Sequence, residues 1–88
     1  MDHFSYTPSP MVCSSRIEVS VEDGIIRDVK FSGGCNGNLQ GVAKLAKDRP
    51  VKEVIELLNG IRCGGKPTSC PDQFAKALQT YLEKKGKV

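Results

Sequence analysis

Four cysteines carry the most specific chemistry in this 88-residue chain: Cys13, Cys35, Cys63 and Cys70. They lie in segments rich in glycine, proline or serine rather than on an apolar helical stripe, so burial as small hydrophobic residues explains the set poorly. Thiolates bind soft metals, and paired thiols form redox-active disulfides. Six residues separate Cys63 from Cys70, which is not the repeated Cys-x-x-Cys spacing of zinc ribbons. The spacing of the cysteines is compatible with both metal binding and thiol redox chemistry.

The composition predicts that these thiols are kept reduced. No basic segment leads into a long apolar run and no stretch reaches membrane-spanning length, so we expect a cytoplasmic protein without membrane association. In that compartment four cysteines favour metal binding or redox chemistry over structural disulfides. The net charge of +3 comes from dispersed lysines, and the chain has no Trp. We therefore expect no nucleic acid partner.

The other polar candidates have structural explanations. The single histidine, His3, lies in an N-terminal tail, where a solvated side chain is more usual than a metal ligand. Ser69 is expected to cap a helix, and Asp72 and Gln73 to stabilise its first turn. The Gly-Gly-x-x-Gly segment at residues 33–37 lacks the GK[ST] ending of phosphate-binding loops. We predict no catalytic residue, no residue that binds an organic cofactor and no nucleotide site.

Strands come first among the elements that must position the cysteines. Apolar and polar residues alternate over residues 16–21, which predicts a half-buried strand. Asp23-Gly24 is a strong hairpin signal because both residues adopt positive φ readily, and residues 25–31 return antiparallel. Residues 3–8 are expected to form an edge strand, where prolines are tolerated. The returning strand is predicted to share three apolar residues on one face: Ile25, Val29 and Phe31.

After the strand at residues 25–31 the spacing of apolar residues changes to a period of about 3.6, which predicts helices. Three helices are predicted, at about residues 38–47, 51–59 and 71–84. Pro50 and Pro71 suit the beginnings of the last two. The predicted fold is α+β, a small three-stranded antiparallel sheet with three helices packed on one face. We expect a single domain over residues 1–88, with residues 1–5 and 85–88 as candidates for disorder.

This outline puts two cysteines at helix N-termini. Cys35 lies in a glycine-rich turn before the first helix, and Cys70 directly precedes Pro71 at the last one. The partial positive charge of a helix N-terminus favours the thiolate over the thiol. Cys13 stands ahead of the first hairpin strand and Cys63 in the loop before the last helix. We expect the four thiols to converge at one end of the sheet.

The sequence resembles the TSCPD domain family. Residues 68–72 spell its signature, Thr-Ser-Cys-Pro-Asp, and the segments around Cys35 and Cys63 fit its other cysteine segments, over Tyr6 to about Leu82. The resemblance implies a four-cysteine metal-binding domain of bacterial proteins, found alone or near the C-terminus of ribonucleotide reductases, notably the adenosylcobalamin-dependent class. The catalytic barrel of a ribonucleoside-diphosphate reductase does not fit in 88 residues. We therefore expect an accessory domain, not an enzyme on its own.

A more distant resemblance is to the U-type iron–sulfur scaffold proteins, which share the order of cysteines, hairpin and helices and so imply a scaffold-like fold. The resemblance puts their three cluster ligands at Cys13, Cys35 and Cys70. The scaffold family's aspartate after its first cysteine is Ser15 here, and its histidine before the last cysteine is Ser69. A fourth cysteine and a lost aspartate favour a closed tetrahedral site over one kept open for cluster transfer.

The leading prediction is a Zn²⁺ site formed by Cys13, Cys35, Cys63 and Cys70. It would lie in an accessory or interaction domain linked to ribonucleotide reduction, with the reductase or another protein as partner. Four thiolates suit iron equally well, so binding or assembly of an iron–sulfur cluster is one alternative. The other alternative is a redox-active dithiol, Cys63 and Cys70, that delivers electrons to the reductase.

Overall fold

The computed structural model describes residues 2–10, 12, 14–33, 36–61, 65 and 68–86. These residues form a three-stranded sheet and three helices, which confirms the predicted α+β fold. Each predicted element is present, with ends that differ by a few residues. The elements in chain order are β1 (Asp2–Tyr6), β2 (Ser14–Glu22), β3 (Ile25–Gly33), α1 (Asn36–Ala46), α2 (Val51–Leu58) and α3 (Cys70–Gly86).

The sheet is an antiparallel meander in the order β1-β2-β3. Tyr6 of the edge strand pairs with Ile17 of the central strand. The turn between β2 and β3 has positive φ at both central residues, 53° at Asp23 and 76° at Gly24. Two positive φ values are the geometry that twists a two-residue hairpin correctly, so the predicted hairpin is confirmed.

A β-bulge in β3 changes which apolar residues reach the core. Ser20 pairs with Asp28, but the next residue of β2 pairs with Ile26, so Arg27 is an extra residue on β3. One inserted residue reverses the faces of the side chains beyond it. Ile26 is therefore fully buried while Ile25 is only partly buried, and the prediction that Ile25 shares the inward face was wrong.

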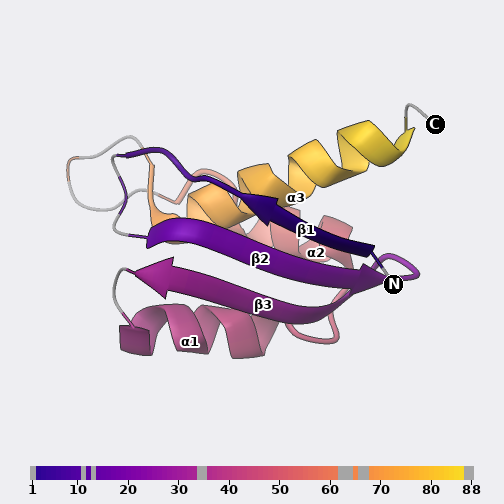
Figure 1. Ribbon diagram of the computed structural model, residues 1–88, viewed down its shortest axis with the longest axis horizontal. Helices are drawn as coiled ribbons and strands as arrows, with labels where there is room; N and C mark the ends of the chain where they lie inside the picture. Colours follow the sequence, from indigo (N-terminus) through magenta and orange to yellow (C-terminus); the bar gives the residue numbers. More distant parts are fainter. Residues whose placement is uncertain are drawn as a thin grey trace.

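One face of the sheet and all three helices enclose a single apolar core (Figure 1). The ring of Phe74 from α3 is fully buried and meets Phe31 of β3 edge-on, with ring centroids 5.6 Å apart. Such contacts fix how α3 lies across the sheet. The buried core residues are Ile17, Val19, Val21, Ile26, Val29, Ala46, Val51, Val54, Phe74 and Leu78. The prediction that the helices pack on one face is confirmed.

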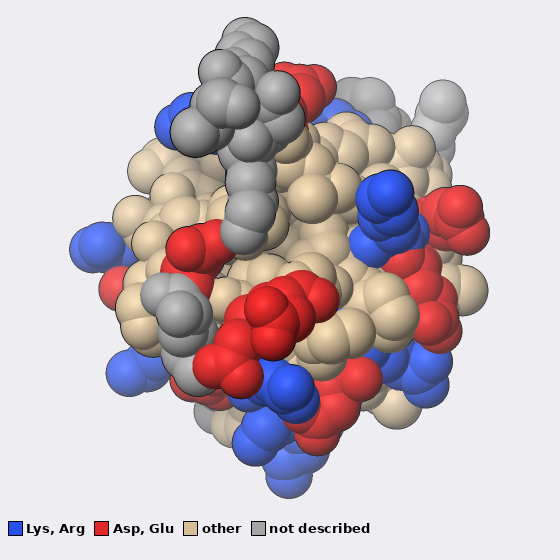
Figure 2. Space-filling view, turned by 90° about the vertical axis from the view of Figure 1, so that its right-hand side faces the viewer, with Lys and Arg blue, Asp and Glu red and all other residues tan. Residues whose placement is uncertain are grey.

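The surface carries both signs of charge. Figure 2 shows the end of the molecule with the turn between β2 and β3, where acidic and basic side chains are interspersed with uncharged ones. Two exposed ion pairs, Arg27 with Asp48 at 3.0 Å and Arg49 with Glu53 at 2.8 Å, are of a kind that contributes at most about 1 kcal/mol. Among the described residues, no helix has both the length and the apolar character needed to cross a membrane.

Candidate functional site

Cys70 is the one predicted metal ligand that lies within the described residues. Cys13, Cys35 and Cys63 lie outside them. Cys70 is the first residue of α3 and is partly exposed, as expected for a thiol at a helix N-terminus. Within the described part of the chain, no three His, Cys, Asp or Glu side chains come together to hold a metal ion. The four-cysteine ligand set therefore stays a prediction.

The described residues next to the other cysteines in the sequence can still be placed. Ser14, which follows Cys13, begins β2 and is paired with Gly33 at the end of β3. Cys35 is two residues beyond Gly33 in the sequence and directly precedes α1. Figure 1 shows the beginnings of β2, α1 and α3 and the end of β3 at the same, left-hand end of the molecule. These four ends of helices and strands therefore lie at the same end of the molecule as Cys70, the first residue of α3.

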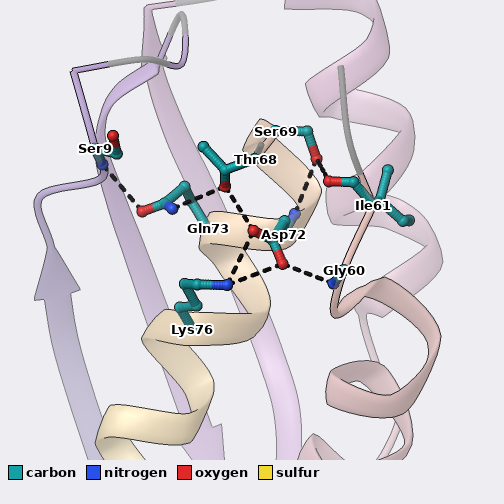
Figure 3. Close-up of polar contacts among 8 residues, drawn as sticks. All are labelled: Ser9, Gly60, Ile61, Thr68, Ser69, Asp72, Gln73 and Lys76. Atoms are coloured by element: carbon teal, nitrogen blue, oxygen red, sulfur yellow. Dashed lines mark hydrogen bonds and ion pairs between the residues drawn. The ribbon is translucent and has the colours of Figure 1, made fainter. Parts of the chain in front are cut away.

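The most extensive polar cluster in the described residues is centred on Asp72, in the first turn of α3 (Figure 3). Its side chain is buried, with 1% of the residue exposed. One carboxylate oxygen accepts a hydrogen bond from the Gly60 N–H at 2.7 Å, and the other accepts one from the Thr68 hydroxyl at 2.5 Å. The Lys76 ammonium donates to both oxygens, at 3.1 and 3.0 Å. Every partner of this carboxylate is a donor.

Ser69 connects the same helix turn to the beginning of the segment that follows α2. Its Oγ accepts a hydrogen bond from the Asp72 N–H at 3.2 Å, which is the geometry of an N-cap. The same hydroxyl donates to the carbonyl oxygen of Ile61 at 2.7 Å. The predicted capping role of Ser69 is therefore confirmed, and the side chain also ties Ile61 to the beginning of α3.

Gln73 extends the cluster to the segment that follows β1. Its amide nitrogen donates to the Thr68 hydroxyl at 2.9 Å, and its amide oxygen accepts from the Ser9 N–H at 3.0 Å. Thr68, Ser69 and Gln73 are all buried. We call the linked side chains of Thr68, Ser69, Asp72, Gln73 and Lys76 the Asp72 network.

The Asp72 network keeps its central carboxyl ionised. Burial opposes ionisation and raises the pKa of Asp72, but the bonds from Thr68, Gly60 and Lys76, together with the charge of Lys76, lower it more. The net result is a pKa of Asp72 below its ordinary value of 3.8. The carboxylate therefore carries its charge at neutral pH and accepts charge-assisted hydrogen bonds, which are stronger than neutral ones.

The sequence predicted only local roles for Asp72 and Gln73. Both were expected to stabilise the end of their own helix, but their side chains bond to Gly60 and to Ser9, 12 and 64 residues away. Periodicity and capping rules describe near neighbours in the sequence and do not report such distant partners. The polar residues on both sides of Cys70 were the feature of the sequence that drew attention to Asp72 and Gln73.

The remaining polar candidate, His3, lies in β1 rather than in a tail. It is exposed, and its Nδ1 lies 2.7 Å from the hydroxyl oxygen of Ser20 on the neighbouring strand. The Gly-Gly-x-x-Gly segment lies partly outside the described residues. His3 and Ser20 thus form a surface pair on the sheet face that the helices leave uncovered.

An apolar groove lies between α1 and α2. Leu45 and Leu57, on its two sides, are 69% and 60% exposed, which is unusual for large apolar residues. Among the described residues that line this groove, Arg49 is the one cation, and its guanidinium is bonded to Glu53 and to the carbonyl oxygen of Leu45. The described residues that line the groove offer mainly apolar contact surface. Its lining residues are Val42, Leu45, Ala46, Arg49, Val54, Leu57 and Leu58.

Comparison with known proteins identifies a family. The family model described as TSCPD domain matches residues 3–82, nearly the whole chain. No curated protein and no solved structure matches. The resemblance to the iron–sulfur scaffold proteins stays a prediction. The match includes residues 68–72, so Cys70 and three members of the Asp72 network, Thr68, Ser69 and Asp72, lie within the family's own signature.

Proposed function

Because the chain belongs to the TSCPD domain family, we propose that it is a metal-binding accessory or interaction domain that serves ribonucleotide reductase in deoxyribonucleotide synthesis. The proposed ligands are Cys13, Cys35, Cys63 and Cys70, and the proposed metal is Zn²⁺. The proposed location is the cytoplasm, where these thiols stay reduced. In this proposal the domain is not an enzyme on its own, and the reductase or another protein is its partner.

The observation that carries the proposal is the position of Cys70. It is the first residue of α3, and it is partly exposed and so accessible to a metal. Ser14 and Gly33, which lie near Cys13 and Cys35 in the sequence, are paired at that same end of the molecule (Figure 1). A closed set of four thiolates suits a structural zinc ion, which would link separate parts of the chain to one another.

The exposed groove between α1 and α2 supports the interaction part of the proposal. Large apolar side chains that are contiguous and exposed are typical of surfaces that contact other proteins. Leu45 and Leu57 form such a surface, and they lie on helices away from the first turn of α3. A domain with a metal site on one side and an apolar surface on another fits an accessory role.

Elemental analysis of the purified protein, together with its visible spectrum, tests the proposal. We expect a colourless protein with one zinc per chain, and a loss of zinc when any one of the four cysteines is replaced by serine. His3→Ala serves as the control and should keep its zinc, because His3 bonds to Ser20 on the uncovered sheet face. A brown protein with visible absorbance would indicate an iron–sulfur cluster in place of zinc. A metal-free protein whose folding is unaffected by every Cys→Ser change would refute the metal site.

A redox role for Cys63 and Cys70 is the second candidate, and the exposure of Cys70 at a helix N-terminus favours it. In that role the two thiols would be oxidised to a disulfide as two electrons and two protons pass to the reductase. Titration of thiols under oxidising and reducing conditions separates the two functions. A zinc-bound set of four thiolates should resist reversible two-electron oxidation until the metal is removed.

A further inference from the structure

We propose that Asp72 is a positioning residue for the thiolate site. In this proposal its carboxylate fixes the backbone at Gly60 and the loop residue Thr68 against the first turn of α3, and this sets how tightly the site that includes Cys70 holds zinc. The inference rests on the proposed function for its metal-binding step. The other part of the inference, that Asp72 fixes the backbone at Gly60, concerns only residues that the structure describes.

The Asp72 network holds backbone atoms of separate segments. It contacts the N–H of Ser9, the N–H of Gly60 and the carbonyl oxygen of Ile61 (Figure 3). Because these contacts use main-chain atoms, they fix where the chain runs and do not merely orient side chains. The segment that follows β1 and the segment that follows α2 are thereby both attached to the first turn of α3.

These attachment points lie close to cysteines in the sequence. Ile61 is two residues before Cys63, Ser9 is four residues before Cys13, and Thr68 and Ser69 directly precede Cys70. Consecutive Cα atoms are about 3.8 Å apart, so an anchored residue limits how far the next few residues can range. Three of the four cysteines thus follow closely on a residue that the network holds.

The central group of the network needs to be a carboxylate. The Asp72 carboxylate is buried and accepts hydrogen bonds from Gly60, Thr68 and Lys76, all of them donors. An asparagine has nearly the same shape, but it replaces one acceptor oxygen with a donor NH₂ that must face one of these donors. Residues that orient metal ligands without touching the metal typically affect its affinity by about 10- to 100-fold.

The test compares Asp72→Asn with Asp48→Asn. Asp48 is an exposed aspartate paired with Arg27, so its replacement makes the same chemical change without touching the Asp72 network. Asparagine also tolerates the positive φ of 67° at this position. Two quantities are measured on each variant: amide hydrogen exchange at Gly60 in zinc-free protein, and zinc affinity by competition with a chelator.

We expect Asp72→Asn to speed exchange at Gly60 roughly tenfold or more and to weaken zinc binding by about 10- to 100-fold, with one zinc per chain at saturation. Asp48→Asn should change neither quantity. If Asp72→Asn does not fold, Thr68→Val, which removes one donor and keeps the carboxylate, is measured in its place and should show the same two changes to a smaller degree.

Three results would overturn the proposal, and they are distinguishable. Faster exchange with unchanged zinc affinity would mean that the network fixes the loop but does not set metal binding, and the proposed function would stand. Unchanged exchange at Gly60 would mean that Asp72 does not fix the loop. Absence of zinc binding by the wild-type protein would refute the proposed function itself, and the positioning role with it.

Discussion

Asp72, Thr68 and Ser69 show what the residues of the family signature do. Thr68 donates to the Asp72 carboxylate, Ser69 caps α3, and Pro71 stands in the first helical turn, where a missing N–H costs no hydrogen bond. Four of the five signature residues therefore build or hold the beginning of the helix. Cys70 is the fifth, and it is the one whose chemistry suits metal binding or redox reactions.

The Asp72 carboxyl should make the stability of the wild-type protein depend on pH in a specific direction. The carboxyl has a pKa below 3.8 in the folded protein and close to about 3.9 when unfolded. The unfolded state therefore takes up the proton first as the pH falls, and protonation favours unfolding. The stabilisation is complete above about pH 4 to 5 and is lost as the pH falls through the folded pKa.

Urea denaturation of the wild type and of Asp72→Asn, at pH values from 7 to 3, measures this effect. At pH 7 we expect the variant to lose about 2 kcal/mol of unfolding free energy, the typical contribution of hydrogen bonds to a charged group. The difference between the two proteins should shrink below about pH 4. A difference that stayed constant over this range would show that the charge of Asp72 does not stabilise the fold.

Gly60 is needed for its backbone conformation, because its φ is 87°. A Cβ there would meet no atom within 4 Å, so Gly60→Ala introduces backbone strain and no clash. We expect a loss of about 1–2 kcal/mol of unfolding free energy. Gly41→Ala, equally free of contacts but inside α1, is the matched control and should gain up to about 1 kcal/mol. Equal effects in urea denaturation would contradict this account.

Helix α3 connects both ends of the structure. Its first turn carries the Asp72 network, and its later turns hold the edge strand β1 through Tyr81. The Tyr81 ring stacks on Phe4 with centroids 4.8 Å apart, and its hydroxyl donates to the Asp2 carboxylate at 2.5 Å. A short edge strand gains a second attachment in this way, since one neighbouring strand alone provides few hydrogen bonds.

Two substitutions at Tyr81 separate these contacts. Tyr81→Phe removes the bond to Asp2 and keeps the ring stack, and we expect it to cost about 0.5–1 kcal/mol. Tyr81→Ala also removes the stack and should cost about 1–2 kcal/mol more. Hydrogen exchange of the β1 amides should accelerate in the same order. If the two variants were equally stable, the stack on Phe4 would not be what holds β1.

The sequence predicted the elements well because each depends on a local pattern. The alternation over β2, the Asp23-Gly24 turn and the apolar stripes of the helices are readable within short windows. The bulge at Arg27 was missed because it depends on how β3 pairs with β2, and the apolar residues on either side of it gave no single period. The distant partners of Asp72 were missed because they depend on how separate segments of the chain pack together. Three of the four predicted metal ligands lie outside the described residues and stay predictions.

At the scale of the whole molecule, the described residues form an apolar core that does not include Cys70, the one cysteine among them. Ten buried apolar residues from the sheet and the three helices form one cluster. In the described residues, no buried side-chain nitrogen or oxygen atom lacks a hydrogen-bond partner. Small zinc domains that unfold without metal lack such a core, because the metal supplies most of their folding free energy.

Removal of metal should therefore leave this protein folded. We expect the far-UV circular dichroism spectrum to be unchanged by a strong chelator and thermal unfolding to stay cooperative. The midpoint should fall, because a metal that binds only the folded state stabilises it by mass action. The four-serine variant provides the control for effects of the chelator itself. A coil-like spectrum after chelation would show that the metal, and not the core, determines the fold.

A related chain without a residue at the position of Arg27 would keep the same strand pairing. Because Arg27 has no partner on β2, its deletion would turn the bulge into a regular ladder and leave Ile26 opposite Val21. A gap of one residue at this point in a sequence alignment is therefore compatible with an unchanged fold. Inward-facing positions of β3 should be aligned separately on the two sides of Arg27, with Val29 as the reference for one side and Ile26 for the other.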